Sequence, residues 1–258
     1  MYVAEIIFKR KGKPDKDADA EDIIYSALAA LLKNGQLLNG DFLIAHRNKD
    51  YIAFVSLPDK DSLDNKYDSQ WVRDNYATLE AGGFARPVIH LLGSALGTDA
   101  VCVCSRRNFF ILFTTFLSME SPLRCGNCFG TVPLYTIPKK PNEDYNDILG
   151  WQSDYQSCDT LQMHCTTGER FGLREMSGFA SSLSKQGRAV CIEIEKKTGK
   201  PAYYYLHRYN GISEKTERQR KCPSCKSDWL LKKPLHKIFD FRCNQCRLLS
   251  NIAWSVRP

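Results

Sequence analysis

Residues 222–246 read CPSCKSDWLLKKPLHKIFDFRCNQC, and this stretch predicts a zinc ribbon. Cys222 and Cys225 form one C-x2-C pair, Cys243 and Cys246 form a second, and seventeen residues separate the two pairs. The spacing falls within the range of four-cysteine zinc sites, because each pair turns the chain so that two sulfurs converge on one ion.

Four thiolates leave zinc no open coordination position, so the predicted ion is structural and stabilises the fold of the ribbon. The residues between the pairs alternate as in two short strands, at 229–231 and 238–241. Trp229, Phe239 and Phe241 would either form the small core of the ribbon or offer rings on which nucleic-acid bases stack. The alternative is a pair of redox-active dithiols. A redox-active C-x2-C motif stands at the start of a helix in a βαβ unit, whereas the residues here alternate as in strands, which disfavours the alternative.

A second cysteine group lies upstream. Cys102 and Cys104 form a C-x-C pair, and twenty residues later Cys125 and Cys128 form a C-x2-C pair with Gly126 in its turn. Glycine favours a knuckle turn, but cysteines two positions apart in a strand point the same way and converge on a metal only where the chain bends. The sequence leaves two interpretations open, a second zinc site or buried thiols beside a lone C-x2-C turn.

The positive charge of the chain is confined to its C-terminal end. Residues 1–209 contain 25 basic and 25 acidic side chains, whereas residues 210–258 contain 11 and 4, so the formal charge of +7 comes from the last 49 residues. Such a module attracts phosphate backbones or the acidic face of a protein, although a ribbon with a small core has a polar surface in any case. The candidate partner-binding residues are Lys215, Arg218, Arg220, Lys221, Lys232, Lys233, Lys237, Arg242 and Arg247.

The remaining sequence predicts an α+β fold, in which a mixed or antiparallel sheet packs against helices and the ribbon follows. Strands are expected at 2–8, 42–46, 51–57, 88–92, 109–116 and 203–206, and helices at 24–34, 71–79, 144–165 and 181–198. The charged stretch 214–221 is expected to be a solvated link into the ribbon. The first elements therefore follow a β-α-β-β-α-β-β order, and the pattern does not fix how the strands pair. The predicted domains are a body, residues 1–209, divisible into a sheet-rich 1–140 and a helical 141–209, and the ribbon, residues 210–258.

No catalytic motif is recognisable. The chain lacks the His-x-Glu of zinc deaminases, H-E-x-x-H, a Walker loop, G-x-G-x-x-G and G-x-S-x-G, so we expect neither catalysis nor a small-molecule substrate. The N-terminus lacks the features of a signal peptide, and the longest apolar run, 109–116, is shorter than the roughly 20 residues of a membrane-spanning helix. We therefore expect a cytoplasmic protein without membrane contact, whose eleven cysteines are thiols or metal ligands.

The ribbon, together with the stretches 112–116, 120–130 and 203–206, resembles a proteobacterial family of unknown function described as zinc-ribbon-containing and as candidate nucleic-acid binders. The resemblance covers most of the chain, more loosely before residue 85. Lys226 departs from it, because the family knuckle usually has glycine there. A side chain strains that turn and leaves the four ligands intact.

Two binding functions follow from these observations. Some relatives are encoded beside polymorphic antibacterial toxins of the Rhs type, so the resemblance implies an immunity protein that binds and occludes a cognate toxin. A toxin inhibitor needs roughly 800 Å2 of surface per partner, and the electrically neutral body would supply it. In the alternative, the basic residues of the ribbon hold RNA or DNA through its phosphates. We favour the immunity protein, because nucleic-acid binding by a ribbon does not require so large a body.

Overall fold

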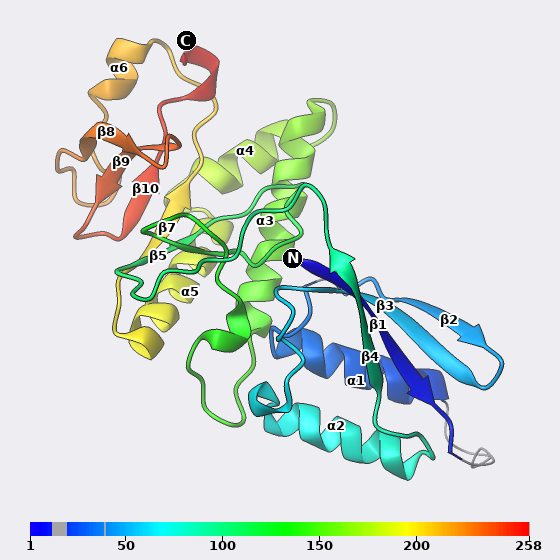
Figure 1. The fold of residues 1–258 in the computed structure, drawn as a ribbon. Helices are drawn as coiled ribbons and strands as arrows, with labels where there is room; N and C mark the ends of the chain where they lie inside the picture. Colours follow the sequence, from blue (N-terminus) through cyan, green and yellow to red (C-terminus); the bar gives the residue numbers. More distant parts are fainter. Residues whose placement is uncertain (12–19, 39, 258) are drawn as a thin grey trace. The chain divides into compact units, whose positions relative to one another are not determined.

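The computed structural model describes residues 1–11, 20–38 and 40–257, which form two compact units (Figure 1). The first unit contains residues 1–101, 119–121 and 131–146. The second contains residues 102–118, 122–130 and the chain from 147 onward. No helix in the described ranges combines the length and the apolar character that crossing a membrane requires.

The first unit has the βαββαβ order of a ferredoxin-like fold. Its elements are β1 (Tyr2–Lys9), α1 (Ala20–Lys33), β2 (Leu43–Arg47), β3 (Asp50–Leu57), α2 (Gln70–Ala81) and β4 (Val88–Ser94), with a 3-10 turn at Asn65–Tyr67. The four strands lie in the order β2-β3-β1-β4, and every neighbouring pair is antiparallel. The element order expected from the sequence is therefore confirmed, and the structure adds the strand order.

Periodicity explains which residues form the core of this unit. Alternate residues of β1, namely Ala4, Ile6 and Phe8, lie in one buried cluster with Ile24 and Leu28 of α1. Strand and helix periodicities thus place their apolar faces against each other.

The second unit is built on a six-stranded sheet in the order β6-β5-β7-β10-β9-β8. The strands are β5 (Phe110–Leu112), β6 (Leu123–Cys125), β7 (Ala202–Leu206), β8 (Leu230–Leu235), β9 (Phe239–Cys243) and β10 (Leu248–Ser250). The helices are α3 (Asn146–His164), α4 (Glu169–Ser177), α5 (Ser182–Thr198) and α6 (Glu214–Arg218), with 3-10 turns at Leu134–Thr136, in the first unit, and Trp254–Val256. β7 pairs in parallel with β5 on one side and with β10 on the other, and the remaining pairs are antiparallel.

The ribbon is part of this sheet. Leu248 of β10 pairs with Tyr204 of β7, and the Tyr204 amide donates to the Arg247 carbonyl at 2.9 Å. The predicted boundary at residue 210 therefore does not separate two sheets, and the division of the body at residue 140 does not match the units either. Local patterns define strands, but β7, the parallel partner of β10, lies more than forty residues away in the sequence.

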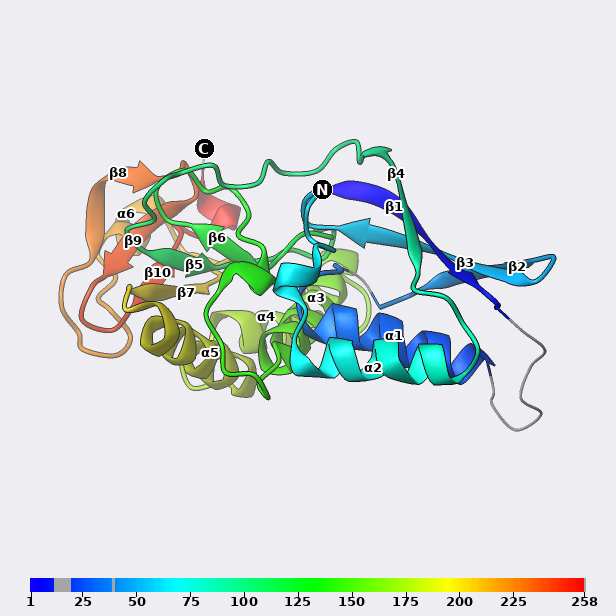
Figure 2. The ribbon, with the colours of Figure 1, turned by 60° about the horizontal axis from the view of Figure 1, so that its bottom comes forward.

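Helices cover one face of the sheet, and aromatic residues fill the other. Figure 2 shows α4 and α5 beneath β5 and β7. On the opposite face, Tyr203, Tyr205 and Phe239 form a buried cluster with Ile111 and Leu249. Every residue of β7 is consequently buried.

Two local predictions need correction, and one helix was missed. The strand expected at 109–116 ends at Leu112, because residues 113–122 form the connection from β5 to β6. The stretch 214–221, expected to be a solvated link, contains helix α6, whose Glu217 is buried. Helix α4 was not predicted at all.

Candidate functional site

The four ribbon cysteines converge on one point. Cys222 and Cys225 lie in the turn before β8, Cys243 ends β9, and Cys246 lies in the turn before β10. Their sulfurs all lie within 4.8 Å of one another, and the Sγ atoms of Cys225 and Cys243 are 3.6 Å apart. Cys222 and Cys243 are buried, whereas the other two are half-buried.

The upstream cysteines form a second group of the same kind. Cys102 and Cys104 precede β5, Cys125 ends β6, and Cys128 closes the following turn. Their sulfurs also lie within 4.8 Å of one another. Cys102 and Cys104 lie in a stretch without strand structure, so the geometric objection to a C-x-C pair in a strand does not apply.

Backbone geometry gives the two groups a common knuckle. The Lys226 amide donates to the Cys222 carbonyl at 3.0 Å, and the Phe129 amide donates to the Cys125 carbonyl at 2.8 Å. In both turns the first cysteine also donates its amide to the carbonyl five residues ahead. The residue that follows each C-x2-C pair has positive φ: 64° at Lys226, 64° at Phe129 and 53° at Arg247. In all three turns the residue after the second cysteine is therefore left-handed, although the side chains there are unrelated.

The thiols differ in acidity in a way that favours metal binding. A hydrogen bond from Ser227 lowers the pKa of Cys225 to about 6, while burial raises the pKa of Cys243 to about 12. Burial raises the pKa of Cys102, but hydrogen bonds from Arg107, the Cys104 backbone, Cys125 and Cys128 together outweigh it, so that this pKa falls to about 7. Each group therefore offers one thiolate near neutral pH, and an incoming cation would displace the remaining protons.

Both groups could hold a metal ion, and their composition is compatible with zinc. Sulfurs in a tetrahedral zinc site are about 3.8 Å apart, given a Zn–S bond of about 2.3 Å. The 3.6 Å between the Sγ atoms of Cys225 and Cys243 is close to that spacing, and the sulfurs of each group lie within 4.8 Å of one another. Since the four ligands of each group fill the coordination shell, the arrangement provides no position for an activated water.

Both groups lie at the same end of the sheet. Cys125 lies opposite Phe110 in the β5–β6 pair, and Phe110 lies opposite Ala202 at the start of β7. Cys243 lies opposite Leu248, which in turn lies opposite Tyr204. Each group therefore lies at the end of one antiparallel pair, β5–β6 or β9–β10, and β7 lies between these two pairs.

Rings and cations connect the two knuckles. The ring of Phe109 packs so closely on Gly126 that a Cβ there would lie 2.2 Å from it, which explains the glycine. The Arg242 guanidinium lies 4.5 Å from the ring centroids of both Phe109 and Tyr203, and it donates to the Tyr203 hydroxyl at 2.8 Å. From the β8–β9 turn, His236 contacts the Gly126 carbonyl at 2.8 Å.

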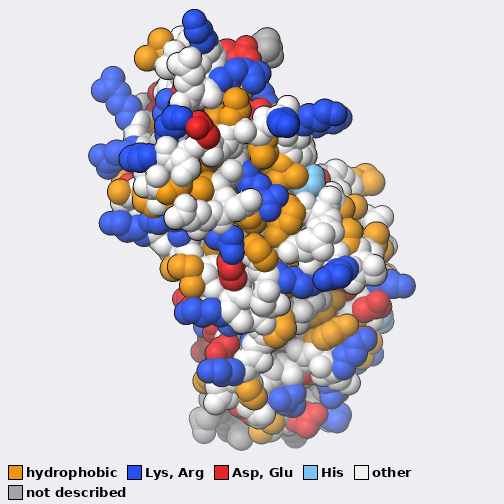
Figure 3. Space-filling view, turned by 90° about the vertical axis from the view of Figure 1, so that its left-hand side faces the viewer, with side chains coloured by type: hydrophobic (Ala, Val, Ile, Leu, Met, Phe, Trp, Pro, Cys, Tyr) orange, Lys and Arg blue, Asp and Glu red, His pale blue; other side chains and the backbone are white. Residues whose placement is uncertain are grey.

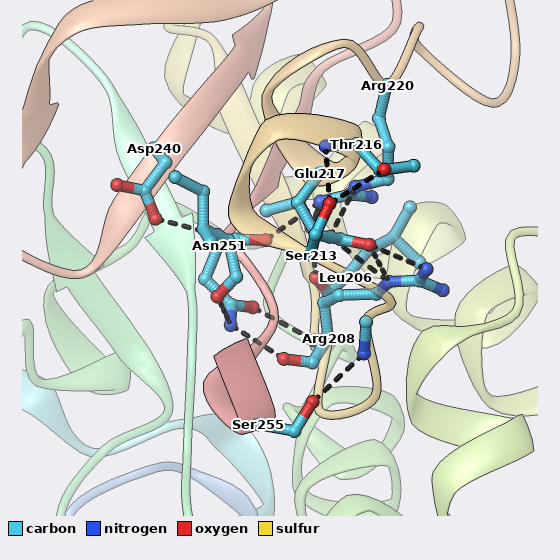
Figure 4. A network of polar contacts seen from close by, with 12 residues as sticks. Leu206, Arg208, Ser213, Thr216, Glu217, Arg220, Asp240, Asn251 and Ser255 are labelled. Carbon is cyan, nitrogen blue, oxygen red and sulfur yellow. Dashed lines mark hydrogen bonds and ion pairs between the residues drawn. The ribbon is translucent and has the colours of Figure 1, made fainter. Parts of the chain in front are cut away.

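Intramolecular contacts engage five of the nine basic residues singled out in the sequence. Arg220 pairs with buried Glu217 at 2.8 Å, as Figure 4 shows, and Arg247 pairs with Glu195 at 3.0 Å. Arg242 is held between rings, as described above. Arg218 and Lys221 form exposed pairs with Glu214 and Asp228.

Four exposed lysines remain, on α6, on β8 and in the β8–β9 turn, and are hereafter called the lysine surface: Lys215, Lys232, Lys233 and Lys237. In the part of the chain that the structure describes, none of the four forms an ion pair. Figure 3 shows Lys and Arg side chains projecting from the upper part of one face, at the level where Figure 1 places α6 and the ribbon strands.

The three aromatic residues between the cysteine pairs of the ribbon belong to its core. Trp229, Phe239 and Phe241 are all buried, and the Trp229 indole donates to the Arg220 carbonyl at 2.9 Å. They are not available to stack on a base. Of the two roles open to them in the sequence, the structure supports the core.

Comparisons with known proteins give a family without an assigned activity. Three family models, all described as domains of unknown function, match in succession: DUF8589 at residues 1–93, DUF2310 at 104–207 and DUF8594 at 211–256. The last match begins close to the predicted start of the ribbon. No solved structure matches the chain.

Two relatives are uncharacterized proteins of Haemophilus influenzae (strain ATCC 51907 / DSM 11121 / KW20 / Rd). One is 32% identical over 259 residues, covering 99% of each chain. The other is 40% identical over 165 residues, covering 64% of this chain and 81% of the relative. The chain therefore belongs to a proteobacterial family of uncharacterized proteins that includes the full-length Haemophilus relative.

Proposed function

We propose that this protein is a non-catalytic immunity protein that binds and occludes a cognate Rhs-type antibacterial toxin, with structural zinc in both cysteine groups. The observation that carries the choice of a protein partner is the division of the nine basic residues. The arginines Arg220, Arg242 and Arg247 serve the fold, and the cations left unpaired are lysines.

This division weakens the case for nucleic acid more than the case for protein. Arginine forks bind phosphates in bidentate fashion, and all four candidate arginines have intramolecular partners, Arg218 in an exposed pair. Isolated lysines instead complement carboxylates on an acidic protein face and accelerate its approach. The β8–β9 turn that bears Lys237 is also held in place by the contact from His236, so the backbone there is already ordered before a partner binds.

Zinc in both groups is the first part of the proposal to test. Metal analysis of the purified protein should give one zinc for each group, two per chain. Cys128→Ser should reduce this to one, whereas Cys165→Ser, which changes an exposed cysteine outside both groups, should leave two. A single zinc in the wild-type protein would contradict the upstream site.

Toxin rescue tests the partner. Co-expression with the cognate Rhs-type toxin should restore growth of the toxin-producing cells, and the two proteins should co-purify. Charge reversal at Lys232, Lys233 and Lys237 should abolish both effects. Reversal at Lys60 and Lys185, exposed lysines elsewhere, should not. Growth arrest despite stable expression of the wild-type protein would refute immunity.

The lysine surface also defines the competing function, nucleic-acid binding. Four lysines allow at most about four phosphate contacts, so affinity should fall by a factor of about 150 between 50 and 200 mM salt if all four bind duplex DNA. Titration of labelled RNA and DNA across salt measures this slope. Tight binding with a salt slope approaching that value would favour the nucleic-acid function over the immunity function.

A further inference from the structure

Strand β4 is an edge strand with an apolar surface. It lies at the end of the order β2-β3-β1-β4, beside β1 in Figures 1 and 2, and no described strand pairs with its outer side. The exposed fractions of its aliphatic side chains are 37% for Val88, 41% for Ile89, 48% for Leu91 and 55% for Leu92. A Cβ at Gly93 would meet nothing within 4 Å, so the strand end is open as well.

The opposite edge shows how the same sheet protects a free strand. β2 has five residues, and two of them are His46 and Arg47. β4 has seven residues and contains no lysine, arginine, aspartate or glutamate. Exposed edges normally carry charges or are short, because their free amides and carbonyls otherwise recruit another strand. β4 has one such device, a bulge between Leu91 and Gly93, and Val88–Leu91 before it runs in regular register with β1.

We infer that β4 pairs with β4 of a second copy of this chain, in antiparallel fashion about a two-fold axis through His90. In this register Ile89 lies opposite the second copy's Leu91, and Val88 lies opposite the second copy's Leu92. Pairing about an axis perpendicular to the sheet keeps the helices of both copies on one side. The product is a continuous eight-stranded sheet.

The side chains of β4 favour a second copy of β4 as the pairing strand. The incoming strand must present aliphatic side chains at the positions opposite Ile89 and Leu91 and must carry no charge, since an unpaired charge there would be desolvated. β4 itself meets both conditions in the register centred on His90. The His90 imidazole at the axis has the Glu5 carboxylate of its own chain 3.9 Å away, so each copy brings its own counter-group. Closed two-fold dimers are also the commonest assembly of soluble proteins.

Light scattering after size-exclusion chromatography tests the inference with the purified full chain and no toxin. Between about 1 and 100 μM the wild-type protein should shift toward twice its mass of 29.4 kDa. Because each copy contributes residue 91, Leu91→Glu places two carboxylates in the interface and should raise the dissociation constant of the dimer by at least about 100-fold. Leu43→Glu, on the opposite edge of the same sheet, is the matched control and should leave the dimer unchanged.

A paired substitution tests the register. Ile89→Lys combined with Leu91→Glu places opposite charges face to face across the proposed axis, so the double variant should dimerise where Leu91→Glu does not. Circular dichroism and zinc content show that each variant is folded. A wild-type monomer throughout this range, a dimer insensitive to Leu91→Glu, or a double variant that stays monomeric would overturn the inference. Because no toxin is present, each result is independent of the proposed immunity function.

Discussion

Helix α6 contains two glutamates whose removal should have very different consequences. Glu217 is 2% exposed and accepts from Arg208 and Arg220, each at 2.8 Å (Figure 4). Glu214 lies three residues earlier and pairs with Arg218 at 2.7 Å, but its side chain is 41% exposed. The same residue type, in one short helix, therefore takes part in a buried and in a surface ion pair.

The magnitudes follow from burial. Glu217→Ala leaves two guanidinium groups without their carboxylate, and loss of one partner of a buried pair costs about 3 to 5 kcal/mol. The Arg220 guanidinium keeps its contact with the Phe241 ring at 4.5 Å and its 2.8 Å hydrogen bond to the Asn251 carbonyl, so we expect the lower end, about 3 kcal/mol. Glu214→Ala removes an exposed pair and should cost about 0 to 1 kcal/mol.

Urea unfolding of the zinc-loaded protein at neutral pH measures both free energies, with fluorescence and circular dichroism as independent probes. The expected difference between Glu217→Ala and Glu214→Ala is about 2 kcal/mol or more, and Glu217→Gln should fall between them because it keeps one acceptor. Equal free energies of unfolding for the two alanine variants would refute the assignment of Glu217, and with it that of Arg220, to the fold.

Three further predictions concern backbone, packing and pH. Lys226→Gly relieves a left-handed residue and should raise the free energy of unfolding by about 0.5 to 1 kcal/mol; a decrease in urea titrations would argue against strain in the knuckle. Gly187→Ala should lower it by about 1 to 3 kcal/mol, because a Cβ would lie 2.2 Å from the Tyr204 ring, whereas Gly150→Ala, in open space on α3, should raise it by about 1 kcal/mol. Burial lowers the pKa of His207 to about 4, so the unfolded chain takes up a proton first as pH falls from about 6.5, and stability decreases toward pH 4. Between pH 7 and 5 the wild-type protein should lose about 2 kcal/mol more than His207→Gln, and equal losses would contradict the buried neutral imidazole.

Local patterns in the sequence predicted the elements whose evidence lies within a few residues. The C-x2-C pairs at 222–225 and 243–246 predicted the ribbon cysteines that the fold brings together. Alternation in 2–8 and 51–57 predicted two paired strands of the first unit. Such signals are local because a turn, or one face of a strand, is determined by adjacent residues.

What could not be predicted depends on distant partners. The parallel pairing of β7 with β10 joins the ribbon to the body, and the sequence of neither strand identifies the other as its partner. Arg220, Arg242 and Arg247 look like surface cations until Glu217, the Phe109 and Tyr203 rings and Glu195 are placed against them. The C-x-C pair at Cys102 left the upstream group undecided, because its bend depends on the surrounding loop. Gly126 already favoured a knuckle turn in the sequence, but the Phe109 ring that leaves no room for a Cβ there is placed only by the fold.

The position of β7 between two hairpins has a consequence for synthesis on the ribosome. β5 precedes β7 by about ninety residues, but its other neighbour, β10, is among the last segments to be made. One edge of a strand rich in tyrosine therefore stays unpaired until the final knuckle has emerged from the exit tunnel. The continuous N-terminal part, residues 1–94, already contains every strand of the ferredoxin-like sheet, so this sheet can form before the later segments are synthesised. We expect the nascent chain to fold in two stages, with chaperone contacts concentrated in the interval between them.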